Sequence, residues 1–180
     1  MVTHTIEELH ELFKSGELDV KEYYKELFEE AKKQQERLNA FVTITEEEAY
    51  KAIEAPMTDD LLSHIPYVLK DNYNTKGIKT TASSKMLADY VPVFNAHVVD
   101  LLNKHGVSLV GKASMDELAM GGTNKSALTG PVHNPWDTRR ISGGSSGGSA
   151  ATCCKWFVFH LHLVVIQVTQ LENQQVFVGL

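Results

Sequence analysis

The feature that most constrains this chain is a long stretch of small and polar residues, numbers 120–149, which ends in the letters SGGSSGGS. Connections of this length without regular structure are uncommon in compact domains and are usually functional or disordered. A flexible linker is disfavoured, because a tryptophan, two arginines and an isoleucine shortly precede the glycines. Two alanines follow at Ala150 and Ala151, which suit the start of a helix. The chain therefore predicts a functional loop that leads into a helix.

The glycine-rich segment leaves several functions open when it is judged on its residues alone. Its backbone N–H groups could cradle an anion at a helix N-terminus. A nucleotide P-loop is disfavoured, because no Gly-Lys-Ser/Thr follows. Residues 143–147 also fit the G-x-S-x-G elbow of α/β-hydrolase esterases, with Ser145 as the nucleophile. That elbow directly follows a strand, whereas the preceding letters NPWDTRRIS are not strand-like.

Helical and strand-like segments alternate before this loop. Apolar spacing predicts a helix that Thr5 caps and Ser15-Gly16 ends, and a second helix over residues 20–31. Further helices are expected over residues 46–55 and 98–105, and strands over residues 38–45, 65–69 and 107–110. Because strands alternate with helices, the predicted class is α/β.

Charge and hydropathy exclude several classes of function. The net charge of −6 gives no general attraction to nucleic acid, so contact with RNA would need a partner or a local patch. The N-terminal letters MVTHTIEEL do not resemble a signal peptide. The apolar run at residues 156–168 is too short to span a bilayer and carries two histidines. We therefore expect a cytoplasmic protein with no membrane association.

The two cysteines, Cys153 and Cys154, are adjacent in the sequence. No second pair is present to complete a zinc site, and neighbouring cysteines rarely form a disulfide. We expect ordinary thiols and no metal site.

Several ordered blocks resemble the amidase-signature family. The block GGSSGGSAA, preceded by NPWD and two arginines, is similar to the core of that signature. Earlier blocks also match the family: NAFVT at 39–43, YVLKDN at 67–72, TASSKML at 81–87 and GKASMDELAMG at 111–121. The resemblance implies an α/β fold in which helices cover a mixed central sheet. Residues 1–152 would form the N-terminal portion of the amidase domain, so the fold would be incomplete.

The family uses a Ser–cis-Ser–Lys triad, and the matched motifs assign Lys70 as its lysine and Ser145 as its bridging cis-serine. A serine needs a base to take its proton, and lysine can serve if burial lowers its pKa. Ser146 is the rival for the relay role. The remaining members of the expected substrate loop are Gly143, Gly144, Ser146, Gly147 and Gly148. The nucleophile is absent from this chain, because no serine follows Ser149.

The family includes stand-alone amidases and the glutamine-hydrolysing A subunits of amidotransferases. The MDELAMG and NPWD blocks resemble the A subunits more closely than the stand-alone amidases. That resemblance implies a glutamine-hydrolysing glutaminyl-tRNA synthase, in which glutamine supplies ammonia for converting Glu-tRNA(Gln) to Gln-tRNA(Gln). The partners would be the B and C subunits. This chain would bind no cofactor, because ATP and Mg would be used by the B subunit. A stand-alone amidase acting on a small carboxamide is the alternative. A fragment that only binds the B or C subunit is the non-enzymatic alternative.

Residues 153–180 form an aberrant tail that does not resemble the family. The genetic code allows codons for residues 159–176 that, when read two bases out of phase, encode the letters PFTLGSDTGDSIRKPAS. This string is nearly the family's nucleophile block, with an aspartate where glycine is usual. We therefore interpret the tail as frameshifted by single-base insertions, after which the letters FVGL at 177–180 resume the family pattern.

Resequencing the locus through codon 180 tests this interpretation. We expect three single-base insertions between about codons 153 and 176, and a corrected frame that encodes the nucleophile block. An insertion-free read that still encodes CCKWFVFHLHLVV would contradict the frameshift.

Overall fold

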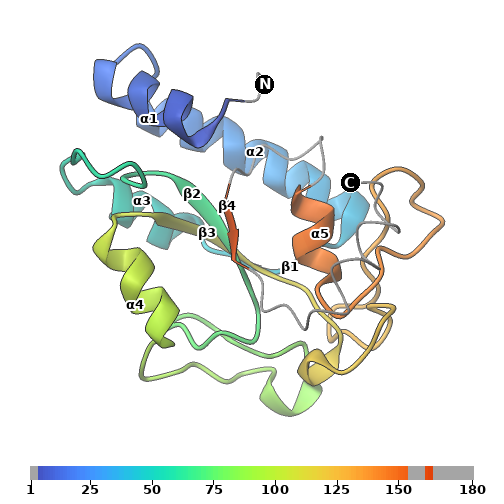
Figure 1. Cartoon of the computed structure of the whole chain (residues 1–180). Helices are drawn as coiled ribbons and strands as arrows, with labels where there is room; N and C mark the ends of the chain where they lie inside the picture. Colours follow the sequence, from blue (N-terminus) through green and yellow to red (C-terminus); the bar gives the residue numbers. More distant parts are fainter. Residues whose placement is uncertain (1–3, 154–160, 164–180) are drawn as a thin grey trace.

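The computed structural model describes residues 4–153 and, as backbone only, residues 161–163. The chain runs through the following elements (Figure 1): α1 (Ile6–Ser15), α2 (Val20–Leu38), β1 (Phe41–Ile44), α3 (Glu46–Ile53), β2 (Pro66–Lys70), η1 (Lys85–Leu87), α4 (His97–Lys104), β3 (Ser108–Ala113), η2 (Glu117–Ala119), α5 (Gly147–Cys153) and β4 (Leu161–Leu163). Helices and strands alternate, which confirms the predicted α/β class.

The strands form one mixed sheet in the order β1-β3-β2-β4. β1 pairs antiparallel with β3, whereas β2 runs parallel to both β3 and β4. Every residue of β2 and β3 is buried, as expected for central strands that are covered on both faces. The two strands end side by side, because Lys70 pairs with Ala113. Their carboxyl ends therefore present residues from both strands at one edge of the sheet.

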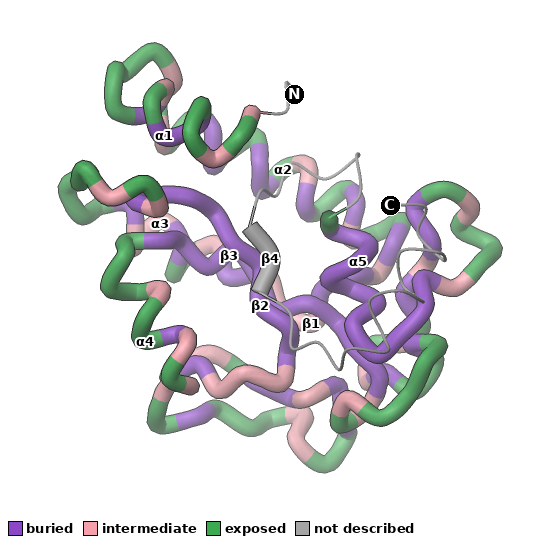
Figure 2. The backbone as a smooth tube through the Cα atoms, in the orientation of Figure 1, coloured by how far each residue is buried: buried purple, intermediate pink, exposed green. Residues whose placement is uncertain are grey.

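The sheet carries a hydrophobic core on each face. On one face, Val68 and Val110 join a core that includes residues of α1, α2, α3 and α5. On the other, Tyr67, Leu69 and Leu109 pack with Val99 of α4. The alternation of Tyr67, Val68 and Leu69 between the two cores follows from the two-residue period of a strand. Figure 2 shows the buried strands enclosed between helices whose outer sides are exposed.

Local signals explain the first helix. The Thr5 side chain accepts a hydrogen bond from the Glu8 N–H, and the Glu8 carboxylate accepts one from the Thr5 N–H, which completes a capping box. Gly16 ends the helix at a φ of 75°, a conformation that glycine adopts without strain. Both predicted boundaries of this helix are confirmed.

Several predicted boundaries were wrong. The first strand begins at Phe41 and not at residue 38, because α2 continues past residue 31 to Leu38 and Asn39 caps it in the left-handed conformation. β3 continues past residue 110 to Ala113, although glycine and lysine are depleted in strands. Gly111 fits there because a Cβ atom would lie 2.8 Å from the Phe41 ring and 2.9 Å from the Thr43 carbonyl oxygen.

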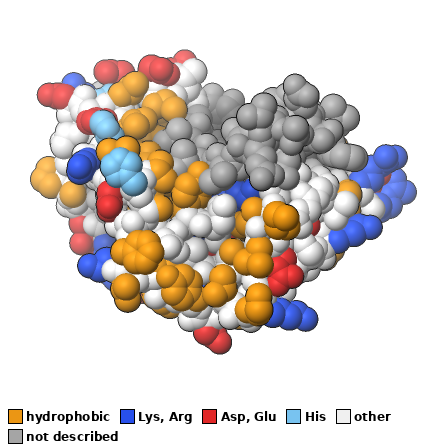
Figure 3. Space-filling view, turned by 60° about the horizontal axis from the view of Figure 1, so that its bottom comes forward, with side chains coloured by type: hydrophobic (Ala, Val, Ile, Leu, Met, Phe, Trp, Pro, Cys, Tyr) orange, Lys and Arg blue, Asp and Glu red, His pale blue; other side chains and the backbone are white. Residues whose placement is uncertain are grey.

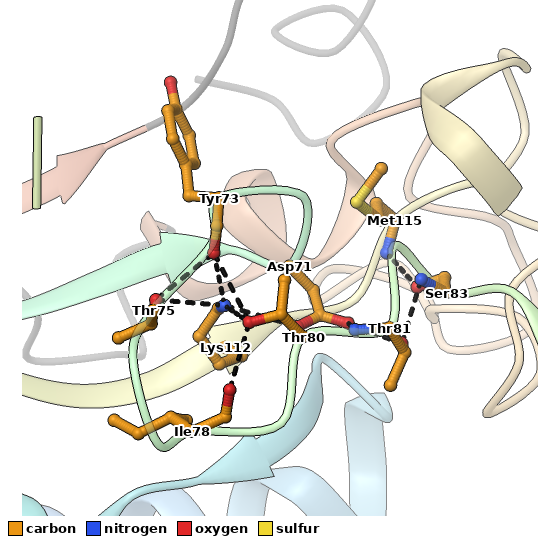
Figure 4. Close-up of polar contacts among 9 residues, drawn as sticks. All are labelled: Asp71, Tyr73, Thr75, Ile78, Thr80, Thr81, Ser83, Lys112 and Met115. Atoms are coloured by element: carbon orange, nitrogen blue, oxygen red, sulfur yellow. Dashed lines mark hydrogen bonds and ion pairs between the residues drawn. The ribbon is translucent and has the colours of Figure 1, made fainter. Parts of the chain in front are cut away.

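A buried ion pair joins β3 to the residue that follows β2. Lys112 Nζ lies 3.5 Å from Asp71 Oδ1, and both side chains are fully buried. The same ammonium group donates to the Tyr73 carbonyl at 2.8 Å and to the Thr80 hydroxyl at 2.8 Å. Asp71 Oδ2 accepts from the N–H and the hydroxyl of Thr81. Figure 4 shows these groups converging on Lys112 and Asp71 from β3, the end of β2 and the loop between them.

Burial opposes the charge on both members of this pair. It lowers the pKa of Lys112 to about 8, although the Asp71 carboxylate works in the other direction. It also raises the pKa of Asp71, against the opposing effects of Lys112 and Thr81. Each charge therefore favours the ionised form of the other and offsets part of the cost of its burial.

Apolar side chains also gather on the outside of the molecule, over the face drawn in Figure 3. Five large apolar side chains are more than half exposed, and four of them lie in two segments, residues 86–94 and 118–120: Met86, Val93, Phe94 and Met120, the fifth being Trp136. A hydrogen bond from Leu118 N–H joins the second segment to the Ala82 carbonyl, four residues before the first. Exposed apolar surface of this kind is typical of an interface.

The frameshift interpretation concerns residues that lie mostly outside the described part. Of the tail, the structure describes Cys153 at the end of α5 and the backbone of β4. Cys154, His160 and the apolar run at 156–168, apart from residues 161–163, lie outside the described residues. Within residues 4–153 and 161–163, no helix is long and apolar enough to cross a membrane.

Replacing Lys112 by methionine tests how strongly the fold depends on the buried pair. We expect Lys112→Met to lower the free energy of unfolding by about 3–5 kcal/mol, because it leaves the buried Asp71 carboxylate unpaired. Urea unfolding followed by circular dichroism measures the loss.

Lys51→Met provides the matched control, because it removes an exposed lysine from its pair with Glu47 and should change stability little. The double variant Asp71→Leu/Lys112→Met should recover part of the loss. A Lys112→Met variant as stable as Lys51→Met would show that the fold does not depend on the buried pair.

Candidate active site

Lys70 is the last residue of β2, whereas the sequence placed it just after the end of that strand. Its side chain is almost fully buried, with 1% of its surface exposed. Nζ donates to Ser145 Oγ at 2.9 Å and to Ser146 Oγ at 2.5 Å. The fold therefore brings together the lysine and both serines that the sequence singled out, across 75 positions of the chain.

Burial changes the acidity of this lysine. Removal of the ammonium group from water lowers the pKa of Lys70 to about 8, and the negative charge of Asp116 partly opposes that change. At pH 7 roughly a tenth of such a group is neutral, compared with less than about a thousandth for an ordinary lysine. A neutral amine accepts protons, so Lys70 is chemically suited to act as a base toward a neighbouring hydroxyl.

The two serines lie in a buried turn that leads into α5. Residues 142–149 are all buried, which a flexible linker would not be. Gly143 has a φ of 81°, a conformation that favours glycine, and the Gly144–Ser145 peptide bond is cis. α5 begins at Gly147, three residues before the predicted start at Ala150, and the Gly147 N–H donates to Asn124 Oδ1 at 3.1 Å.

The glycines of the expected substrate loop are closely surrounded by other segments. A Cβ atom on Gly144 would overlap the Asp116 carboxylate, and one on Gly147 would lie 2.5 Å from Asn124 Oδ1. On Gly148 it would lie 2.5 Å from the Ser114 carbonyl oxygen. Close packing, rather than mobility, explains why glycine occupies these positions. Their contact with a substrate stays a prediction.

The arrangement does not favour the esterase elbow. A nucleophile elbow follows a strand directly, whereas residues 134–142 form turns, with a single bridging pair between Ile141 and His133. The base that contacts Ser145 is a lysine rather than a histidine.

Asp116 is a site residue that the sequence arguments overlooked. It is 1% exposed, and its N–H donates to the Ser145 carbonyl at 3.0 Å. The signal that could have revealed it is an acidic residue shortly after the carboxyl end of a buried strand, at the same sheet edge as Lys70. Metal binding has no comparable support, because no group of three His, Cys, Asp or Glu side chains in the described part could hold an ion.

Comparison with known proteins gives an independent result. A model of the amidase family matches residues 22–156. The A subunit of glutamyl-tRNA(Gln) amidotransferase from Thermoanaerobacter pseudethanolicus is 45% identical over 153 residues, which cover 82% of this chain and 31% of that protein. The protein of the same name from Streptococcus pneumoniae is 48% identical over 152 residues, again covering 82% and 31%. The chain therefore spans about a third of the length of these relatives.

Solved structures agree with the fold. The A subunit of glutamyl-tRNA(Gln) amidotransferase from Thermotoga maritima matches with a TM-score of 0.70 at 35% identity, covering 83% of this chain and 31% of that one. The 6-aminohexanoate cyclic dimer hydrolase matches with a TM-score of 0.76 at 27% identity, with the same coverage. The mixed sheet with its covering helices is thus part of a larger fold.

The depressed pKa of Lys70 predicts a pH dependence of stability. Between about pH 8 and the ordinary lysine value, the unfolded chain binds more protons at this position than the folded chain. The free energy of unfolding should therefore rise with pH in that window, and its Lys70 contribution should be lost as pH falls through 8.

The measurement compares the unaltered chain with Lys70→Met by urea unfolding at pH 7 and pH 10. From pH 7 to pH 10, we expect the free energy of unfolding of the unaltered chain to rise by about 2 kcal/mol relative to that of Lys70→Met. Lys51→Met, at an exposed site, controls for general effects of alkali. An equal difference at both pH values would contradict a lowered pKa.

Proposed function

Because this chain belongs to the amidase family, we propose that it is part of an amide hydrolase in which Lys70 is the base and Ser145 the relay. The observation that carries the proposal is the buried contact between Lys70 Nζ and the two serine hydroxyls. The lowered pKa of Lys70 supports it, because the neutral amine is the form that takes a proton.

In the proposed mechanism, the nucleophilic serine gives its proton to Ser145 as it attacks the amide carbonyl. Ser145 passes its own hydroxyl proton to the neutral Lys70 amine. The resulting ammonium returns a proton through Ser145 to the leaving nitrogen, which departs as ammonia or an amine. Water then hydrolyses the acyl-enzyme by the same proton route. Lys70 contacts Ser146 as well, so Ser146 is the rival relay.

The nucleophile would come from the block that a corrected reading frame encodes. No serine follows Ser149 in the printed chain, so the 180-residue chain would lack hydrolytic activity. This part of the proposal depends on the frameshift, whereas the roles of Lys70 and Ser145 do not.

The substrate proposed for the full-length protein is glutamine. Relatives that are 43–48% identical are named as the A subunit of glutamyl-tRNA(Gln) amidotransferase. By analogy, the ammonia would pass to a B subunit that uses ATP and Mg to amidate Glu-tRNA(Gln), with a C subunit completing a cytoplasmic complex. The acidic net charge fits an arrangement in which a partner supplies most contacts with tRNA.

A stand-alone amidase acting on a small carboxamide is the second candidate. It is favoured by the TM-score of 0.76 with 6-aminohexanoate cyclic dimer hydrolase, although the identity is only 27%. The two candidates share the Lys70–Ser145 chemistry and differ in substrate and partners.

Release of ammonia from glutamine tests the proposal. We expect the full-length protein in its corrected frame, expressed with its B and C subunits, to hydrolyse glutamine, and the 180-residue chain to release none. Lys70→Ala in the corrected protein should lower kcat by roughly 1000-fold or more, since it removes the base and leaves the serines without a proton acceptor.

Lys76→Ala serves as the control, because this exposed lysine lies shortly after β2 and no hydrogen bond among the described residues joins it to either serine. Hydrolysis of simple carboxamides without glutaminase activity would favour the stand-alone amidase. Full activity of the Lys70→Ala protein would remove Lys70 from the mechanism.

A further inference from the structure

The Asp116 carboxylate is buried beside the turn that carries Ser145, and none of the proposed chemical steps uses it. It makes no ion pair within the described residues, although its charge acts on Lys70 through space. A buried carboxylate that is not paired with a cation costs stability unless hydrogen bonds compensate it. Its contacts therefore indicate what the residue does.

The carboxylate organises the loop that precedes the glycine-rich turn. Oδ2 accepts the N–H groups of Thr123 at 3.2 Å and Asn124 at 2.9 Å, and Oδ1 accepts the hydroxyl of Ser126 at 2.9 Å. Three donors from one short segment satisfy the buried charge without a cation. The negative charge is thereby kept in place near Lys70.

Two routes connect Asp116 to the turn. The Asp116 N–H donates directly to the Ser145 carbonyl at 3.0 Å. The second route runs through Asn124, whose backbone is held by the Asp116 carboxylate and whose side-chain oxygen accepts the Gly147 N–H at 3.1 Å. The residues on both sides of Ser146 are thus fixed by the same aspartate. The lack of space for a Cβ atom on Gly144 beside this carboxylate adds a steric contact.

We propose that Asp116 is the positioning residue of this site, holding the turn of Ser145 against Lys70 through its backbone and its buried carboxylate. The role deepens the proposed function and rests on it, because Lys70 and Ser145 must be the reacting pair for their alignment to matter. Asp116 itself contacts the turn through the Ser145 carbonyl and not through a reacting atom.

The charge of Asp116 has a second effect, which a purely mechanical role would not produce. Burial lowers the pKa of Lys70, and Asp116 opposes that change. The other charged groups at this sheet edge, Asp71 and Lys112, face each other in their own ion pair. Removing the Asp116 charge should therefore lower the pKa of Lys70 further, whereas loosening the turn should let water in and raise it. The two effects have opposite signs.

The test is a titration of the lysine Cε resonances by NMR in the full 180-residue chain labelled with 13C at this carbon. Lys70→Arg and Lys112→Arg assign the two buried lysines. Asp116→Asn keeps a side-chain oxygen for the Thr123 and Asn124 N–H groups but removes the charge, so we expect it to move the Lys70 midpoint to lower pH and leave the Lys112 midpoint in place. Asp116→Ala removes that oxygen as well and loosens the turn, so its Lys70 midpoint should lie above that of Asp116→Asn. Asp89→Asn, which alters an exposed carboxylate, should move neither. Equal Lys70 midpoints in Asp116→Asn and Asp116→Ala, in chains with native circular dichroism spectra, overturn the proposal.

Ser126→Ala decides the question if the Asn variant does not fold. It removes one donor from Asp116 Oδ1 and leaves the backbone bonds to the carboxylate intact. More of the negative charge then acts on Lys70, so its midpoint should rise while that of Lys112 stays constant, and an unmoved Lys70 midpoint overturns the proposal. The titration needs no activity: an ordinary lysine midpoint for Lys70 in the unaltered chain would instead remove the base from the proposed function.

Discussion

The buried pair of Lys112 and Asp71 is the interaction on which the site depends. Lys112 belongs to β3, Asp71 follows β2, and the Asp71 N–H extends the pairing of the two strands by donating to the Ala113 carbonyl at 3.1 Å. Thr81 donates two hydrogen bonds to Asp71 Oδ2, which hold the intervening loop against the strand end. Since neighbouring side chains of an extended chain point in opposite directions, fixing Asp71 also fixes the direction of Lys70.

Two buried lysines with a pKa of about 8 thus lie at one edge of the sheet. They differ in their hydrogen-bond and ion-pair partners, and this difference gives them different roles. Lys112 is surrounded by a carboxylate, a carbonyl and hydroxyl groups, so its ammonium form is well solvated by the protein. Lys70 has two serine hydroxyls as hydrogen-bond partners and no carboxylate within ion-pair distance among the described residues. Of the two lysines, only Lys70 contacts Ser145 and Ser146, so its neutral amine can accept a proton from these hydroxyls, as a base must.

Sequence alone predicted those parts of the molecule that local signals determine. The boundaries of α1 at Thr5 and Gly16 were predictable, because capping depends on residues within one turn. The motifs also singled out Lys70 and Ser145, which lie in contact in the fold. It failed where tertiary contacts decide. Gly111 and Lys112 are poor strand formers, and they extend β3 because of Phe41 and the buried Asp71. The role of Asp116 was overlooked although it closely follows a buried strand, because its hydrogen-bond donors lie several residues further along the chain.

The glycine-rich segment shows why composition and conformation must be separated. Its letters are those of a flexible linker, yet each residue from 142 to 149 is buried. Gly144 faces Asp116 and Gly148 faces the Ser114 backbone, so the absent side chains are what allow three segments to meet there. Contacts on both sides of Ser146 remove the freedom that glycine normally brings. A serine held in this way keeps its hydroxyl at one distance from Lys70, and orientation of that kind lowers the entropic cost of proton transfer.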